Sequence, residues 1–236
     1  MNGTVGVVAL ILAGGSGSRM NMCCPKQYLK IDGIPIIVHT IRKFQDSEEI
    51  SSIIVVCAKE WVQYVKDLCV KYGLGKVGYI VEGGKTSYDS LHYGIEAINN
   101  NYPNNPIVLV HESVRPLVTS DIISENIRIC MEHGKAVSAI TGNEAIAYSD
   151  DGCSASVFYD RSKMFAIQMP QSYRLSELVE VFGEAEKKGI KSQSLNTLMV
   201  EMNHVPLFFS KGSHMNIKLT NQEDIPLFEY LFHVQK

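Results

Sequence analysis

An apolar run over residues 5–12 ends abruptly in the glycine-rich turn Ala13-Gly14-Gly15-Ser16-Gly17-Ser18, and no other feature restricts the fold of this chain as strongly. A run of this length and composition predicts a strand that is buried on both faces. Glycine lacks a Cβ atom, so the turn can fold tightly and bring its backbone N–H groups against an anion. Arg19 and Lys26 follow the turn and add positive charge beside those donors. The segment therefore predicts a polyphosphate site at the end of a strand.

Strand-like and helix-like segments alternate along the first 140 residues. Apolar runs occupy residues 5–12, 52–57, 77–81, 107–111 and 136–140, and helical periodicity occupies residues 35–45, 61–72, 86–99 and 120–133. This alternation predicts right-handed βαβ units, a mainly parallel sheet and helices on both of its faces. We therefore expect a Rossmann-like three-layer α/β sandwich. Since no linker-like stretch divides the chain, we expect one domain over residues 1–236.

The pattern changes after residue 140. Residues 142–160 are polar and rich in turn-forming residues, and Asp150-Asp151-Gly152 is a candidate hairpin turn. We expect an extended β-arm that leaves the sheet, approximately over residues 142–162. Beyond it, the periodicity predicts helices over residues 175–187, 195–202 and 223–233, and strands over residues 205–210 and 216–220.

Polar segments follow three of the predicted strands. They are the glycine-rich turn, Gly83-Gly84-Lys85 with Ser90 close behind, and His111-Glu112-Ser113-Val114-Arg115-Pro116. Ligands of open parallel sheets bind beyond the carboxyl ends of the strands, so we expect these segments to share a site. His111 ends an apolar strand and is predicted to be a hydrogen-bonded core residue. Arg115 is predicted to hold its loop through an ion pair.

The composition argues against several partners. A net charge of −3 with 20% charged residues gives no basic surface of the kind that nucleic acid requires. No apolar run is long enough to span a bilayer, and no signal peptide is recognised. The six cysteines match no zinc pattern and are interpreted as free thiols of a reducing cytosol. We expect a cytoplasmic protein that binds neither nucleic acid nor a membrane.

The glycine-rich turn matches neither of two common phosphate loops. The third glycine of G-x-G-x-x-G is missing, and so is the Gly-Lys-Ser/Thr of a Walker loop. The seven-residue step from Arg19 to Lys26 and the run Pro25-Lys26-Gln27-Tyr28-Leu29 instead resemble the cytidylyltransferase family that includes methylerythritol-phosphate and ribitol-5-phosphate cytidylyltransferases. The similarity covers almost the whole chain. It includes the two segments beyond the later strands, Asp160-Arg161, Gln168-Met169-Pro170-Gln171 as the far side of the arm, and Asn216-Ile217-Lys218-Leu219-Thr220 as a terminal strand.

This resemblance implies a Mg²⁺-dependent nucleotidyltransferase that joins CTP to a polyol phosphate and forms a homodimer through the arm. By resemblance, Arg19, Lys26 and Lys218 are the catalytic cations, and the backbone from Ala13 and Gly14 through Gly15, Ser16, Gly17 and Ser18 holds the phosphates. Gly84 and Ser90 face the nucleoside, and Glu112 binds the metal. On the acceptor side, Arg161 holds the phosphate across the dimer interface, while Asn143 of the arm and Asn196 contact the acceptor's hydroxyl groups. Arginine suits such bidentate binding of a phosphate.

The chain departs from the family pattern mainly at acidic positions. Glu112 stands where the family has a metal-binding aspartate, Asn143-Glu144 replaces Asp-Thr, and Leu195-Asn196 replaces Thr-Asp. Ser87 replaces an arginine, although Lys85 is close by, and Met215 replaces an aspartate of the methylerythritol branch. Ser113-Val114 is closer to the ribitol branch, so ribitol 5-phosphate or a relative is the preferred acceptor.

Two alternatives remain open at this point. One is a methylerythritol-phosphate cytidylyltransferase, and the other is a catalytically degenerate relative that acts as a binding or assembly module. Three converging cations repel one another unless an anion is present, which favours an active enzyme.

Overall fold

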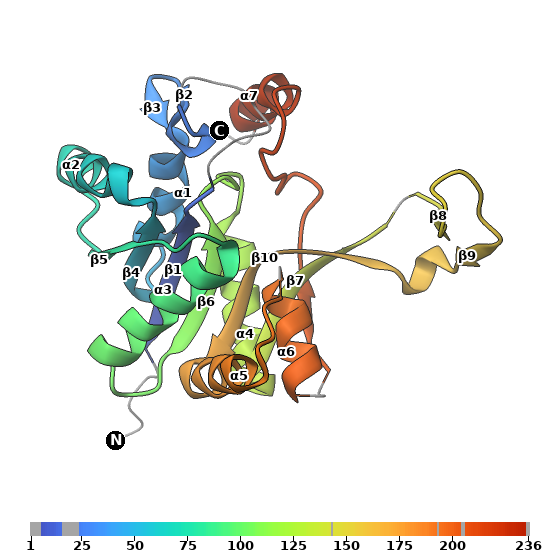
Figure 1. Cartoon of the computed structure of the whole chain (residues 1–236). Helices are drawn as coiled ribbons and strands as arrows, with labels where there is room; N and C mark the ends of the chain where they lie inside the picture. Colours follow the sequence, from blue (N-terminus) through green and yellow to red (C-terminus); the bar gives the residue numbers. More distant parts are fainter. Residues whose placement is uncertain (1–5, 16–23, 143, 193, 204–205, 235–236) are drawn as a thin grey trace.

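The computed structural model describes residues 6–15, 24–142, 144–192, 194–203 and 206–234. Within these residues, seven strands form one sheet in the order β11-β7-β10-β6-β1-β4-β5 (Figure 1). They are β1 (Val7–Ala13), β4 (Ile50–Cys57), β5 (Val77–Glu82), β6 (Ile107–Glu112), β7 (Lys135–Thr141), β10 (Phe165–Arg174) and β11 (Phe209–Lys211). All the parallel strands predicted up to residue 140 are present, with ends that differ by one or two residues wherever the structure describes them.

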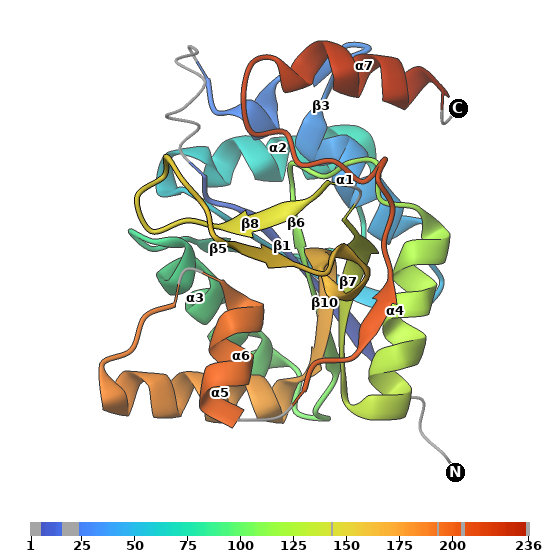
Figure 2. The ribbon, with the colours of Figure 1, turned by 90° about the vertical axis from the view of Figure 1, so that its right-hand side faces the viewer.

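Helices cover both faces of the sheet. They are α1 (Ile36–Gln45), α2 (Val62–Tyr72), α3 (Ser87–Asn101), α4 (Ser120–His133), α5 (Leu175–Lys188) and α6 (Leu195–Asn203). Helix α7 (Asp224–Val234) packs instead in a separate apolar cluster with Ile31 and Ile36. Alternate residues of β1 point to opposite faces, so Ala9 and Ile11 pack against α1, α2 and α4, whereas Val8 and Leu10 pack against α3, α5 and α6. Figure 2 shows the two helical layers on either side of the sheet. The predicted three-layer α/β sandwich is confirmed.

A central strand, β10, was not predicted from the sequence. It pairs antiparallel with both β6 and β7, whereas the other pairs of this sheet are parallel in the described chain. The interpretation of Gln168-Met169-Pro170-Gln171 as the far side of the arm is therefore wrong, because these residues lie in β10.

The strand predicted over residues 216–220 is absent from the described structure. The segment lies alongside the loop after β6 and makes a backbone hydrogen bond from the Leu219 N–H to the Val114 carbonyl at 3.1 Å. Its backbone makes isolated hydrogen bonds instead of a ladder. The alternation of apolar residues in the sequence could not reveal this difference. Of the strand predicted over residues 205–210, the structure shows β11, and residue 205 lies outside the described residues.

The predicted arm is a two-stranded ribbon, β8 (Ile146–Tyr148) paired with β9 (Val157–Tyr159), which projects from the body of the molecule (Figure 1). At its tip, the Asp151 carboxylate accepts hydrogen bonds from the backbone N–H groups of Cys153 and Ser154, at 2.9 and 2.8 Å, and Gly152 has a φ of +70°. This positive φ suits glycine, which closes the hairpin where the sequence predicts a turn.

Four of the six cysteines, Cys57, Cys69, Cys130 and Cys153, are free thiols in the structure. Burial raises the pKa of Cys57 to about 11 and that of Cys130 to about 12, so both stay protonated at neutral pH. None of the helices in the described ranges combines the length and apolar character that crossing a bilayer requires.

Candidate active site

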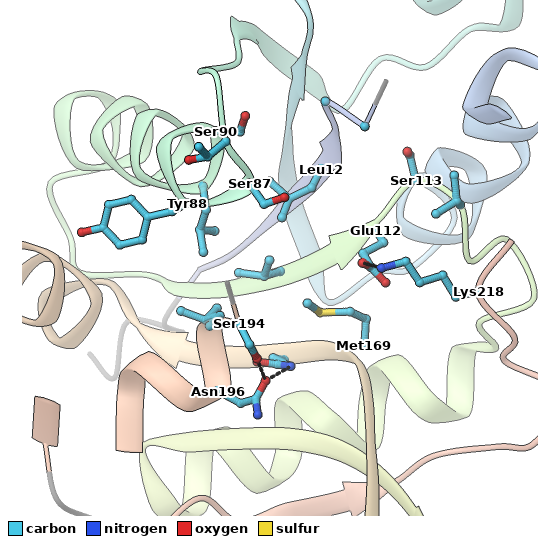
Figure 3. Close-up of a pocket in the computed structure, with 18 of the residues that line it drawn as sticks. Leu12, Ser87, Tyr88, Ser90, Glu112, Ser113, Met169, Ser194, Asn196 and Lys218 are labelled. Atoms are coloured by element: carbon cyan, nitrogen blue, oxygen red, sulfur yellow. Dashed lines mark hydrogen bonds and ion pairs between the residues drawn. The ribbon is translucent and has the colours of Figure 1, made fainter. Parts of the chain in front are cut away.

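The carboxyl ends of β1, β5 and β6 open onto one cavity of about 760 Å³. Residues predicted to act together line it from six parts of the chain. They are Gly14 and Gly15 after β1, then Lys26, then Gly84 and Ser90 after β5, then Glu112 at the end of β6, then Asn196, and finally Lys218. Figure 3 shows Ser87, Tyr88 and Ser90 on one side of the cavity and Glu112, Lys218, Ser194 and Asn196 on other sides. The sheet topology thus gathers residues that lie up to 204 positions apart in the sequence, from Gly14 to Lys218.

Lys26 begins the short turn η2 (Lys26–Tyr28), which the neighbouring Gln27 fastens to the phosphate turn. The Gln27 side-chain N–H groups donate to the carbonyls of Ala13 at 2.7 Å and Gly15 at 2.9 Å. Tyr28 stacks on Trp61 with ring centroids 4.2 Å apart. Gln27 is a positioning residue that the sequence did not reveal, because its partners are backbone carbonyls.

The turn after β5 is shaped by the first turn of α3. Thr86 and Asp89 form a capping box, in which each side chain accepts a hydrogen bond from the backbone N–H of the other. The Gly84 N–H donates to the Ser90 Oγ at 3.1 Å. A Cβ atom on Gly84 would lie 2.3 Å from the Cβ of Asp89, so only glycine fits there. Ser90 thus braces this loop and is itself almost fully buried.

Glu112 lies between two cations. Its Oε1 accepts a hydrogen bond from Lys218 Nζ at 2.5 Å, and its Oε2 accepts one from Arg115 Nε at 2.7 Å. Burial alone would raise the pKa of this carboxyl, but the charges and hydrogen bonds of Lys218 and Arg115 outweigh it and lower the pKa below its ordinary value. Glu112 is therefore an anion at neutral pH. It also supplies a resident partner for Lys218, so the position of that lysine needs no bound ligand to explain it.

His111 is a core residue, as predicted. It is fully buried, and its Nε2 lies 3.0 Å from the Arg115 carbonyl oxygen. Burial lowers its pKa to about 4, so the ring is neutral at physiological pH. The ion pair predicted for Arg115 is also present, and it holds the loop after β6.

The far wall of the cavity carries amide side chains. Tyr173 donates its phenol hydrogen to Gln171 Oε1 at 3.0 Å, and Gln171 Nε2 donates to Asn196 Oδ1 at 3.4 Å. Ser194 also donates to Asn196 Oδ1 (Figure 3). Since Oδ1 already accepts two hydrogen bonds, the group that Asn196 can offer to a ligand is its Nδ2.

Some predicted site residues lie elsewhere. Ala13 is buried and is not among the residues that line the cavity, although its carbonyl holds Gln27. Arg161 begins the short turn η4 (Arg161–Lys163) beside the arm, away from this cavity. Ser16, Gly17, Ser18, Arg19 and Asn143 lie outside the described residues.

Comparison with known proteins identifies the family of this chain. The family model described as IspD, 2-C-methyl-D-erythritol 4-phosphate cytidylyltransferase, matches residues 7–233. The ribitol-5-phosphate cytidylyltransferase of Streptococcus agalactiae serotype III is 35% identical over 230 residues, which cover 97% of this chain and 96% of the relative. The 2-C-methyl-D-erythritol 4-phosphate cytidylyltransferase of Clostridium botulinum is 32% identical over 222 residues, which cover 94% and 95% of the two chains.

The crystal structure of 4-diphosphocytidyl-2C-methyl-D-erythritol synthase from Anaerococcus prevotii has the same fold, with a TM-score of 0.83, 22% identity and coverage of 98% and 99% of the two chains. Fold and sequence together make this chain a nucleotidyltransferase. More closely, the chain belongs to the IspD family of cytidylyltransferases. The family predicted from the step between Arg19 and Lys26 is thereby confirmed.

Proposed function

We propose that this protein transfers a cytidylyl group from CTP to a polyol phosphate. A phosphate oxygen of the acceptor attacks the α-phosphorus of CTP, the bond from that phosphorus to the bridging oxygen of the β-phosphate breaks, and pyrophosphate leaves with the bonding electrons. The observation that carries the proposal is the convergence of Gly14, Gly15, Lys26 and Lys218 on one cavity in a chain that matches cytidylyltransferases along almost its whole length.

Both reactants are anions, so catalysis rests on positioning and on neutralising negative charge. The glycine-rich turn supplies N–H donors for the β- and γ-phosphates, and Arg19 belongs to the same proposal. Lys26, held by the turn that Gln27 fastens, neutralises the triphosphate. Lys218, which pairs with Glu112 in the same cavity, adds a second positive charge for the phosphates. Gly84 and Ser90 line the end of the cavity that receives the nucleoside.

We propose Mg²⁺ as the cofactor, with Glu112 as its protein ligand. Among the described residues that line the cavity, Glu112 is the one carboxylate, and no cluster of three or more His, Cys, Asp or Glu side chains is present in the described parts of the chain. Magnesium in nucleotide sites is commonly held by one or two carboxylates, with phosphate oxygens and waters as the other ligands. A lone carboxylate beside a phosphate-binding turn fits that donor set. The ion would supply positive charge that offsets the charge developing on the leaving pyrophosphate.

Ribitol 5-phosphate or a related polyol phosphate is the acceptor that we favour. Five relatives between 32% and 35% identical are ribitol-5-phosphate cytidylyltransferases, and methylerythritol-phosphate enzymes follow at 32–33%. The Nδ2 of Asn196 offers the acceptor hydroxyls a hydrogen-bond donor. Asn143 remains part of the proposed acceptor site.

We further propose that residues 1–236 act as a single nucleotidyltransferase domain in a cytoplasmic homodimer. The arm presents exposed apolar side chains, among them Tyr148, Phe158 and Tyr159. An apolar ribbon of this kind favours contact with a second copy of the chain. The same contact would bring Arg161 to the partner's cavity as the ligand of the acceptor phosphate.

The direct test measures pyrophosphate release with CTP, Mg²⁺ and either ribitol 5-phosphate or 2-C-methyl-D-erythritol 4-phosphate, with other polyol phosphates as a panel. Turnover with CTP and ribitol 5-phosphate is expected. Preference for UTP or GTP would contradict the cytidylyl assignment, and preference for the methylerythritol acceptor would select the other branch. Absence of both turnover and CTP binding would instead support a binding or assembly module. Removal of divalent ions with EDTA should abolish turnover, and restored Mg²⁺ should recover it.

A further inference from the structure

Strand β10 carries a two-residue bulge at Met169 and Pro170. In the ladder with β7, Gln168 pairs with Ser138 and Gln171 pairs with Val137, so the two residues between have no ladder partner on that side. The ladder with β6 starts only at Gln171. Carbonyl groups that leave a ladder inside a protein need other donors.

Two asparagine side chains supply those donors. Asn216 Nδ2 donates to the Met169 carbonyl at 2.7 Å, and Asn126 Nδ2 donates to the Pro170 carbonyl at 3.2 Å. Both asparagines are fully buried. They differ in what they are attached to, since Asn126 belongs to helix α4 and Asn216 lies two residues before Lys218.

Asn216 also joins the bulge to the other end of the cavity. Its backbone carbonyl accepts a hydrogen bond from Arg115 Nη1 at 2.8 Å, and the same guanidinium binds Glu112 through Nε at 2.7 Å. The Oδ1 of Asn216 is buried and has no partner in the described residues, so the contact made by its side chain there is the Nδ2 donor. One asparagine thus connects β10, Arg115 and the segment that carries Lys218.

This connection matters because residues 216–220 form neither a helix nor a strand. No ladder fixes their backbone, which is held by separate contacts instead, among them those of Asn216 and of the Leu219 N–H, while Glu112 pairs with the Lys218 ammonium. A lysine side chain carries about 2 kcal/mol of rotamer entropy, and its ammonium can be held at one place only if its backbone is held first.

We propose that Asn216 is a positioning residue for Lys218. Through its hydrogen bonds with the β10 bulge and with Arg115, it holds the Lys218 ammonium within reach of both Glu112 and the CTP phosphates. The inference rests on the proposed function, because it assumes that Lys218 acts on bound CTP. It assigns the buried amide a role in the reaction that is separate from its contribution to stability.

A double-mutant cycle tests this proposal through CTP binding and turnover. Asn216→Ala is expected to weaken CTP binding measured by calorimetry about fivefold to tenfold, and to lower kcat by at least a similar factor. In the Lys218→Ala background the same substitution should change the CTP dissociation constant less than about twofold, because the residue through which Asn216 acts is gone. Equal effects in both backgrounds would show a structural role only and would overturn the proposal.

Asn126→Ala is the control at the bulge: it removes the donor to the next carbonyl and, in addition, the contacts of Asn126 with Ser210 and Ser172. It should lower the melting temperature and leave CTP binding and kcat within about twofold of the parent protein. Should Asn216→Ala fail to fold, Asn216→Ser replaces it in the cycle; both variants keep the backbone carbonyl that Arg115 binds, and both remove the Nδ2 donor to Met169. A parent protein that neither binds CTP nor releases pyrophosphate would refute the proposed function itself. A parent that does both, with an additive cycle, would refute only the positioning role.

Discussion

Lys218 and Glu112 are 106 residues apart in the sequence, yet the lysine ammonium lies 2.5 Å from a carboxylate oxygen of the glutamate. The pair joins the end of β6 to the segment before α7 at the edge of the cavity. Under the proposed function, the CTP phosphates and Glu112 share this ammonium group.

The lowered pKa of Glu112 predicts how this contact depends on pH. A carboxyl whose folded pKa lies below its ordinary value of 4.5 contributes stability that is fully present above that value and is lost as the pH falls through the folded pKa. Glu112→Gln should lower the free energy of unfolding by about 1.5–3 kcal/mol at pH 7. Melting curves of both proteins from pH 7 to pH 3 should show the difference shrinking below about pH 4.5. A difference that stays constant with pH would contradict the charge of Glu112.

Glu112→Asp addresses the metal. The shorter side chain is the one that the resembling family uses, so we expect Glu112→Asp to retain activity at saturating Mg²⁺, whereas Glu112→Gln should lose it. Activity measured over a Mg²⁺ titration separates the two. Equal activity of Glu112→Gln and the parent protein would show that this carboxylate does not serve the metal.

Lys26→Ala should lower kcat by about 10²–10³ while leaving the fold intact, because it removes a fixed positive charge from the proposed triphosphate site. Pyrophosphate release measures the effect, and circular dichroism checks the fold. Lys30→Ala is the matched control, since Lys30 is an exposed lysine four residues on and does not line this cavity. Activity near that of the parent protein would make Lys26 an ordinary loop lysine.

Gly84→Ala should raise the KM for CTP, because its new Cβ atom would meet Asp89 at 2.3 Å and must displace the first turn of α3. Crowding of this kind typically costs about 1–3 kcal/mol. Gly75→Ala provides the comparison, because nothing lies within 4 Å of its Cβ position. The two KM values distinguish a loop shaped around the nucleoside from a loop that tolerates any small residue.

Arg161 allows a test of the arm. Arg161→Ala should raise the KM for the polyol phosphate, and Lys218→Ala should be nearly inactive. If the arm completes the partner's site, a refolded one-to-one mixture should recover about a quarter of the parental activity at low acceptor concentration, since half the dimers are mixed and each has one intact site. No recovery in a mixture whose mixed dimers are verified by native mass spectrometry would place Arg161 in its own subunit's site, or outside any site.

The sequence predicted the parallel half of the sheet well, because buried parallel strands are continuous apolar runs that are visible locally. It missed β10, whose Gln168, Gln171 and Ser172 are polar although buried. Their partners come from elsewhere: the Ser172 hydroxyl donates to Asn126 Oδ1 at 2.6 Å, and Gln168 Nε2 donates to the Ser213 carbonyl at 3.0 Å. Polar groups that find their hydrogen-bond partners far away in the sequence leave no periodic pattern in the local sequence.

The same distinction applies to the site. Glycines and cations at strand ends can be recognised in the sequence, because phosphate binding requires these residue types in any fold. Gln27 and Asn216 were not recognised as site residues, because an amide acquires its role only from the carbonyl that it meets after folding. Asn196 entered the prediction by resemblance, and the structure adds the contacts that leave Nδ2 as its remaining donor.

The place of β10 in the sheet also dictates the order in which a nascent chain can complete its fold. Both ladder partners of β7 in the described sheet, β10 and β11, come after it in the sequence, and the ribbon of β8 and β9 is made before either. During synthesis, β7 emerges from the ribosome with no neighbouring strand to receive it. Contacts between segments that are far apart in the sequence form slowly, so the second half of the molecule folds after the first. A chain released before residue 174 would contain the glycine-rich turn, but its central sheet would be incomplete.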